Sequence, residues 1–124
     1  MYRILFIVGL GGAIGSILRY LASVYLSKLV AHAFPLGTFV VNISGCLVIG
    51  VVFGLSERFE WFSPEWRLFL ATGICGGFTT FSTFAYENIQ LLQNGDYKTF
   101  FIYSLLSFVF GLLAVLVGMS LTKI

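Results

Sequence analysis

Apolar residues follow one another in four long runs along the chain, and short polar segments separate these runs. The runs cover approximately residues 4–29, 37–55, 66–92 and 99–121. A helix needs about 20 mostly apolar residues to cross the hydrocarbon core of a bilayer, and each run approaches or exceeds this length. The pattern therefore predicts an all-α membrane protein in which residues 1–124 form a single domain of four transmembrane helices.

The segments between the runs carry the signals of membrane interfaces and tight turns. Pro35 precedes the second run and suits the first turn of a helix. Trp61 and Trp66 stand at the start of the third run, and tryptophan side chains favour the level of the lipid headgroups. Asn94 and Gly95 form a turn signal before the fourth run. None of these connections is long enough to hold a second domain.

The composition agrees with a membrane protein and disfavours several other classes. Of the 124 residues, 59% are hydrophobic and 10% are charged, whereas soluble domains carry about 25% charged residues. The net charge of +2 is dispersed, so no basic patch for nucleic acid is expected. The only histidine, His32, has no catalytic partner, and no phosphate-binding loop is present, so we do not expect an enzyme. Cys46 and Cys75 lie inside apolar runs and are interpreted as small buried residues.

The basic residues show only a weak preference for one side of the membrane. Four spans place both ends of the chain on the same side, together with the segment around residues 56–66. The basic residues of that side are Arg3, Arg58, Arg67 and Lys123, and those of the other side are Lys28 and Lys98. Orientation follows the lysine and arginine content of short loops, so this small difference is compatible with insertion in both orientations. An antiparallel dimer of two identical chains would then be accessible.

Arg19 is the most unusual residue of the first run. A charged side chain in the middle of a membrane helix costs about 2.5–3.5 kcal/mol on insertion scales. Arg19 shares a helix face with Gly11 and Gly15, because the three are spaced by four residues. The glycines allow another helix to approach closely. Arg19 therefore either extends to the membrane surface or faces protein or a water-filled vestibule, where it would attract anions.

Thr38 and Asn42 place polar groups on one face of the second run, four residues apart. A carboxamide in an apolar environment requires hydrogen-bond partners. Asn42 could satisfy this requirement through a hydrogen bond between helices. Alternatively, its amide group could donate to an anion that passes through the membrane.

The third run contains residues that interrupt a membrane helix. Gly76 and Gly77 are followed by Thr79 and Thr80, and both residue types have low helix propensity. An interruption inside the membrane is tolerated where it is buried in protein or lines a cavity, and it frees main-chain carbonyl groups that can bind a small cation. The alternative is that Gly73 and Gly77 only permit close helix packing. A break between residues 76 and 80 is the interpretation that we pursue.

A helix that resumes at Thr80 would present a mixed polar and aromatic wall. At 100° per residue, one arc of about 160° holds the following side chains: Thr80, Phe81, Thr83, Phe84, Glu87 and Asn88. The edge of a phenylalanine ring is electropositive, and hydroxyl and amide groups can donate hydrogen bonds. These donors favour a pathway for a small anion. Glu87 would then be neutral through protonation, a mobile hydrogen-bond partner, or a charge at the membrane surface.

Three blocks of sequence together resemble the Fluc (CrcB-type) family of fluoride channels. They are GLGGAIGSILRY at residues 9–20, PLGTFVVNISG at residues 35–45 and TGICGGFTTFSTFAYE at residues 72–87. The resemblance covers the whole chain and includes the four-span layout. It implies an antiparallel, dual-topology homodimer with two pores in the bacterial inner membrane, which exports cytoplasmic fluoride passively.

The resemblance also implies roles for individual residues. Arg19 would lie at the vestibule of the pore. The residues that would contact fluoride or line the pore are Thr38, Asn42, Phe81, Ser82, Thr83, Phe84, Glu87 and Tyr103. The main-chain carbonyls of Gly76 and Thr79 would hold a structural sodium ion on the dimer axis, shared between the two copies. Cys46 occupies a position where a serine is common.

A small multidrug-type transporter of organic cations is the nearest alternative. Such transporters are also four-span, dual-topology dimers of about this size, and they use a glutamate in the first helix. The first run of this chain carries Arg19 and no acidic residue, so its charge has the wrong sign for a cation. A purely structural subunit would explain the apolar helices but would not explain the interrupted third run.

Overall fold

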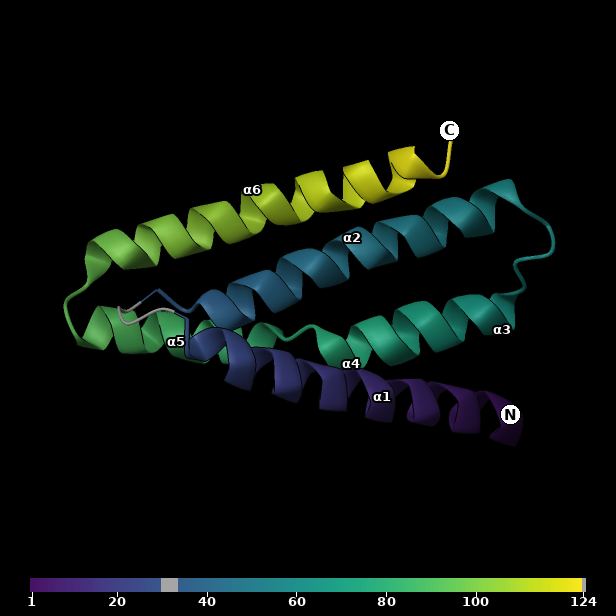
Figure 1. Ribbon diagram of the computed structural model, residues 1–124, viewed down its shortest axis with the longest axis horizontal. Helices are drawn as coiled ribbons and strands as arrows, with labels where there is room; N and C mark the ends of the chain where they lie inside the picture. Colours follow the sequence, from purple (N-terminus) through teal and green to yellow (C-terminus); the bar gives the residue numbers. More distant parts are fainter. Residues whose placement is uncertain (30–33, 124) are drawn as a thin grey trace.

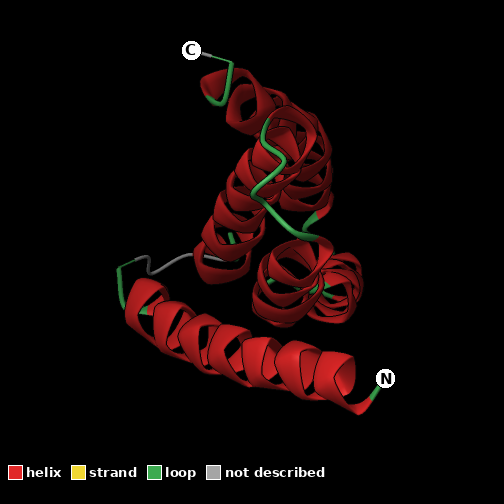
Figure 2. Cartoon of the chain, turned by 90° about the vertical axis from the view of Figure 1, so that its right-hand side faces the viewer, coloured by secondary structure: helices red, strands yellow, loops and turns green. Residues whose placement is uncertain are grey.

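The computed structural model describes residues 1–29 and 34–123, and the regular structure in these ranges is helical (Figures 1 and 2). His32 lies outside the described residues. In chain order, the helices are α1 (Tyr2–Ser27), α2 (Leu36–Arg58), α3 (Pro64–Arg67), the π-helix η1 (Leu68–Cys75), α4 (Gly76–Phe78), α5 (Phe81–Gln93) and α6 (Tyr97–Leu121). All four predicted membrane runs therefore form helices.

Four stretches of helix are long and apolar enough to cross a membrane, as the sequence predicts. They are Tyr2–Ser27, Leu36–Arg58, Pro64–Gln93 and Tyr97–Leu121. Only 11–28% of the most apolar window of each stretch is buried inside the chain, so most of the apolar surface is available to lipid or to another protein. Both termini lie at the same end of the molecule, as an even number of spans requires (Figure 1).

The helices pack in two pairs that are not consecutive in the sequence. α1 lies along η1 and α4, and α2 lies along α6 (Figure 1). Glycines allow both approaches: a Cβ atom at Gly11 would lie 2.7 Å from the carbonyl oxygen of Phe69, and one at Gly50 would overlap the carbonyl oxygen of Val115. The prediction that Gly11 allows another helix to approach closely is confirmed.

The third span changes its geometry before it is interrupted. Residues Leu68–Cys75 form a π-helix, which the sequence did not lead us to expect, and a single α-helical turn follows at Gly76–Phe78. Thr79 and Thr80 are then extended. Thr79 has φ −83° and ψ 159°, and Thr80 has φ −151° and ψ 121°. β-branched residues tolerate this conformation well. The predicted break is therefore present, and it consists of the two threonines.

The break is shorter than the predicted range of residues 76–80, because it does not include Gly76 and Gly77. Both glycines are helical, and Gly77 instead serves the contact with α1. A Cβ atom at Gly77 would lie 3.1 Å from the Cα atom of Gly12. The low helix propensity of glycine is offset here because the missing side chain allows two backbones to touch.

Hydrogen bonds from capping side chains determine where α5 and α6 begin. The Thr80 hydroxyl accepts a hydrogen bond from the Thr83 N–H at 3.2 Å and thereby caps the N-terminus of α5. Asp96 caps α6 in the same manner, because its carboxylate accepts from the Thr99 N–H at 3.1 Å. Gly95 has a φ of +74°, a value that favours glycine. The predicted turn at residues 94–95 is confirmed.

Candidate functional site

Asn42 on α2 holds the interrupted backbone in place. Its amide group donates to the Thr80 carbonyl oxygen at 3.0 Å, and its carbonyl oxygen accepts from the Thr80 N–H at 2.8 Å. The N–H and C=O of one extended residue point to the same side, as they do in a strand, so a single carboxamide can pair with both. Of the two interpretations left open for Asn42, the structure shows the hydrogen bond between helices, and its partner is the main chain of the break.

Arg19 also contacts the interrupted span. Its Nε donates a hydrogen bond to the Gly77 carbonyl oxygen at 3.1 Å. Gly77 lies in the last turn before the break, where a continuous α-helix would have supplied a donor from Phe81. A guanidinium at this end of a helix also interacts favourably with the helix dipole. Arg19 is thus bound to protein rather than extended to the membrane surface.

Two further carbonyl groups at the break lose the donors that a continuous helix would supply. The α-helical donor for the Gly76 carbonyl would be the Thr80 N–H, which binds Asn42 instead. The donor for the Thr79 carbonyl would be the Thr83 N–H, which binds the Thr80 hydroxyl. Gly76 and Thr79 therefore present carbonyl oxygens that are released from the helical pattern, and carbonyl oxygens are suitable ligands for a hard cation.

Glu87 joins three helices at the centre of a polar cluster. One carboxylate oxygen accepts from the Thr38 hydroxyl at 2.9 Å, and the other accepts from the Tyr103 hydroxyl at 2.9 Å. Thr38 lies on α2 and is 6% exposed, and Tyr103 lies on α6 and is fully buried. This arrangement favours the hydrogen-bond partner among the three interpretations of Glu87, because the side chain is turned into the protein.

Two clefts lie near the candidate site residues, and one of them contains the Glu87 cluster. We call the first the Glu87 cleft, about 420 Å³ in volume, whose polar lining includes Arg19, Thr38, Thr83 and Glu87. We call the second the Phe81 groove, about 530 Å³ in volume, whose lining includes Asn42, Cys46, Thr80, Phe81, Phe84, Ser104 and Ser107. The polar and aromatic arc predicted for α5 is therefore divided between two openings.

A row of aromatic rings connects the two clefts. The ring centroids of Phe81 and Phe84 are 5.8 Å apart, and those of Phe84 and Tyr103 are 4.9 Å apart. Tyr103 then donates to Glu87. Phe81, at the outer end of the row, is 78% exposed. We use the term polar track for the series Phe81, Phe84, Tyr103, Glu87 and Thr38.

Some residues of the site did not stand out in the sequence, and one predicted residue lies apart. Ser104 and Ser107 both line the Phe81 groove, and the Ser107 hydroxyl oxygen is buried without a hydrogen-bond partner among the described residues. The four-residue spacing from Tyr103 to Ser107 is the signal that could have identified Ser107. Ser82 is exposed and lines neither cleft. Cys75 is buried as predicted, whereas Cys46 is only partly buried.

The fold and the site together define a multi-pass helical membrane protein with a polar track between its helices. The family model described as CrcB-like protein, Camphor Resistance (CrcB), matches residues 6–119. The chain belongs to this CrcB family.

Curated relatives extend over nearly the whole chain and carry the name fluoride-specific ion channel FluC. The protein of that name from Azobacteroides pseudotrichonymphae is 46% identical over 123 residues, which cover 99% of this chain and 98% of the relative. The one from Flavobacterium psychrophilum is 47% identical over 121 residues, 98% of each. The one from Bacteroides fragilis is 49% identical over 112 residues, 88% of this chain and 87% of the relative. These relatives are named as channels and not as enzymes.

Proposed function

We propose that this protein is a fluoride-selective channel that exports cytoplasmic fluoride passively across the bacterial plasma membrane. The observation that carries the proposal is the polar track, in which hydroxyl groups and aromatic rings form a continuous series of contacts between two clefts. The names of the relatives support fluoride as the ion. Selective conduction requires donors that replace the hydration of the ion and still release it, and neutral donors of this kind meet both requirements.

The hydrogen bonds of Glu87 suggest how an anion would be passed along the track. The hydroxyl groups of Thr38 and Tyr103 both donate to the carboxylate. An anion that reaches this point would compete with the carboxylate for the same donors. The second N–H of Asn42, which Thr80 does not use, and the Thr83 hydroxyl would donate to the anion, and Phe81 and Phe84 would offer ring edges. Arg19 would add a positive charge at the Glu87 cleft, and Ser82 would serve the more exposed end of α5.

The function is tested by ion efflux from proteoliposomes loaded with fluoride or chloride. We expect electrogenic fluoride efflux without an imposed proton or sodium gradient, and at least about tenfold slower chloride efflux, which corresponds to about 1.4 kcal/mol of discrimination. An ion-selective electrode records both fluxes. Equal flux of both anions would contradict fluoride selectivity, and transport of large organic cations would favour the multidrug-type alternative.

Variants at the two phenylalanines of the polar track test whether their rings contribute to fluoride efflux. Phe81→Ile and Phe84→Ile keep an apolar side chain but remove the electropositive ring edge. We expect each variant to lower fluoride efflux by at least about tenfold, because one donor of the track is lost. Phe101 is 68% exposed and lines neither cleft, so Phe101→Ile should leave efflux unchanged. Full fluoride efflux in both Phe81→Ile and Phe84→Ile would show that the two rings serve packing and not conduction.

We further infer that two copies of the chain form an antiparallel dimer with two pores. The exposed ring of Phe81 and the open Phe81 groove support a second copy at this surface. The weak charge bias supports insertion in both orientations. Asn94→Cys in a background of Cys46→Ser and Cys75→Ser should react with impermeant thiol reagents from both sides of the membrane. Reaction from one side only would contradict dual topology.

A sodium ion at the dimer axis is the cofactor that this arrangement would accommodate. The carbonyl groups of Gly76 and Thr79 fit it, because their usual helical donors are engaged elsewhere. Such an ion would supply positive charge where two interrupted spans approach each other. Dimer assembly should therefore weaken when N-methylglucamine replaces sodium, as measured by size-exclusion chromatography. An equal fraction of dimer in sodium and in N-methylglucamine would contradict a structural sodium ion.

A further inference from the structure

A charged groove lies far from the polar track, at the end of the molecule that holds both termini. Its volume is about 340 Å³, and it is lined by Arg3, Ile7, Leu10, Ser63, Glu65, Trp66 and Phe69. Arg3 stands at the start of the first span, and Glu65 stands at the start of the third. Both spans begin at this end of the molecule (Figure 1). We therefore place the groove at the level of one membrane surface.

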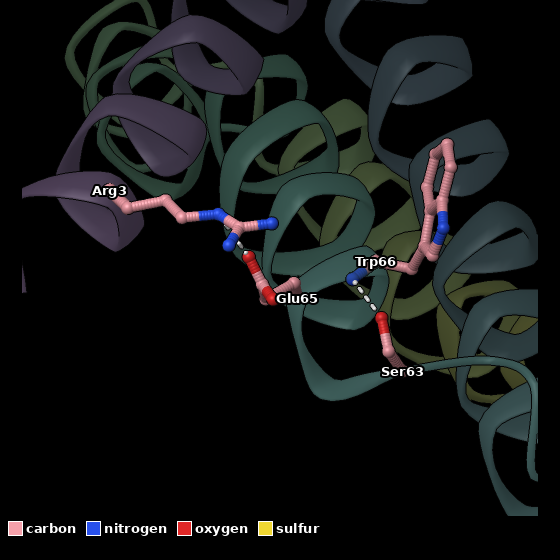
Figure 3. A network of polar contacts seen from close by, with 4 residues as sticks. All are labelled: Arg3, Ser63, Glu65 and Trp66. Atoms are coloured by element: carbon pink, nitrogen blue, oxygen red, sulfur yellow. Dashed lines mark hydrogen bonds and ion pairs between the residues drawn. The ribbon is translucent and has the colours of Figure 1, made fainter.

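The mouth of the groove carries one positive and one negative group with unused bonding capacity. Arg3 Nε lies 2.9 Å from Glu65 Oε2, and the two side chains are 80% and 41% exposed (Figure 3). This ion pair lacks hydrogen-bond alignment, since Glu65 Oε2 is buried without a hydrogen-bond partner in the described part of the chain. A guanidinium has five N–H donors, so further donors of Arg3 remain for a ligand. An exposed pair of this kind contributes little to stability and can open to admit one.

The local structure fixes the position of Glu65. The Ser63 hydroxyl accepts from the Trp66 N–H at 3.3 Å, which caps α3, and Pro64 occupies the first turn (Figure 3). The Trp66 ring contacts Phe69 edge to face, with centroids 6.2 Å apart. Trp66 is therefore both a wall of the groove and an aromatic side chain suited to the headgroup level.

The groove becomes apolar as it runs toward the membrane interior. Arg3, Ile7 and Leu10 share one face of α1, and the rise of an α-helix places Leu10 about 10 Å deeper than Arg3. Phe69 of η1 forms the opposite apolar wall. A ligand that fits must combine a cationic and an anionic group at the surface with an apolar portion below them.

We propose that this groove binds a zwitterionic phospholipid whose headgroup carries a primary ammonium, that is, a phosphatidylethanolamine. The phosphate accepts from the free donors of Arg3, and guanidinium and phosphate form bidentate pairs. The ammonium donates to the Glu65 carboxylate. An acyl chain lies along Ile7, Leu10 and Phe69. A choline headgroup has no N–H donor for Glu65, and a purely anionic headgroup meets the carboxylate as a like charge. The site involves no residue of the polar track and does not depend on the proposed function.

Native mass spectrometry of the full chain tests this assignment. The protein is equilibrated in micelles that contain equal amounts of dioleoyl phosphatidylethanolamine, phosphatidylcholine and phosphatidylglycerol. We expect the wild type to retain the ethanolamine lipid about tenfold over the choline lipid, the ratio that corresponds to about 1.4 kcal/mol. Glu65→Gln should abolish this preference, and Arg3→Gln should reduce the retention of both lipids.

The single variants Glu60→Gln and Lys123→Gln are the matched controls, because each removes one charge of the same sign outside the groove, just after the ends of α2 and α6. Both controls should retain lipid as the wild type does. Equal retention of the ethanolamine and choline lipids by the wild type would overturn the proposal. So would preferential retention of phosphatidylglycerol, displacement of all lipid by a second copy of the chain, or behaviour of the groove variants identical to that of the controls. Circular dichroism confirms that each variant is folded.

Discussion

Asn42→Ala is expected to abolish most of the fluoride flux and to destabilise the interrupted span. The substitution removes both hydrogen bonds to Thr80, at 2.8 and 3.0 Å. A buried polar group without a partner costs about 1–3 kcal/mol, and the N–H and C=O of Thr80 would both lose theirs. We expect flux in proteoliposomes to fall by more than about tenfold, since tenfold corresponds to about 1.4 kcal/mol, with a lower thermal unfolding midpoint in detergent.

Asn94→Ala makes the same chemical change in an exposed turn and serves as the control. It should leave both the flux and the unfolding midpoint close to those of the wild type. Asn42→Asp separates the two roles of the amide, because a carboxylate can still accept from the Thr80 N–H but cannot donate to its carbonyl. If Asn42→Ala conducts and unfolds like the wild type, the two hydrogen bonds do not hold the break in place.

Gly15→Ala is expected to prevent α1 from packing on the third span. A Cβ atom at this position would overlap the Ile74 carbonyl oxygen and would lie 2.9 Å from the Phe78 backbone nitrogen. Both atoms belong to the main chain and cannot move aside like the end of a long side chain. Overpacking of this kind costs about 1–3 kcal/mol or more. We expect a large decrease in monodisperse protein on size-exclusion chromatography.

Gly9→Ala tests whether this loss arises from the contact rather than from a changed helix. No atom outside the local helix lies within 4 Å of a Cβ atom at Gly9. Because alanine favours helix by about 1 kcal/mol relative to glycine, Gly9→Ala should fold at least as well as the wild type. Equal yields of the Gly9 and Gly15 variants would be inconsistent with the close approach of α1 and η1.

The pattern of apolar residues was sufficient to predict the spans, because bilayer thickness imposes a length that the sequence displays directly. The structure places the second span at Leu36–Arg58 and the third at Pro64–Gln93, close to the predicted 37–55 and 66–92. The ends differ because helices continue into the interface, where Ser63 caps α3 and charged residues such as Arg58 are tolerated. The π-helix could not be predicted, since residues Leu68–Cys75 carry no local signal that separates it from an α-helix.

The sequence was sufficient to predict which residue types form the site, but not which residues lie together in each cleft. Helical spacing placed Thr83 and Glu87 on one face, and the structure brings both to the Glu87 cleft. The spacing could not show that Phe81 opens into a different groove, because that depends on where α2 and α6 lie. Propensity predicted an interruption within residues 76–80. It could not show that Gly76 and Gly77 stay helical, since it contains no information about the α1 backbone that packs against Gly77.

The pairing of α1 with η1 and α4, and of α2 with α6, has a consequence for biosynthesis. In each pair, the partner is synthesised only after at least one other span has left the ribosome. The close glycine contacts of α1 and α2 therefore form only after their later partners are inserted, although consecutive spans such as α1 and α2 also touch. Chain termination before α6 would leave Gly50 unpaired and would remove Ser104 and Ser107 from the Phe81 groove. The last helix to be made therefore completes both the packing of α2 and the candidate pathway.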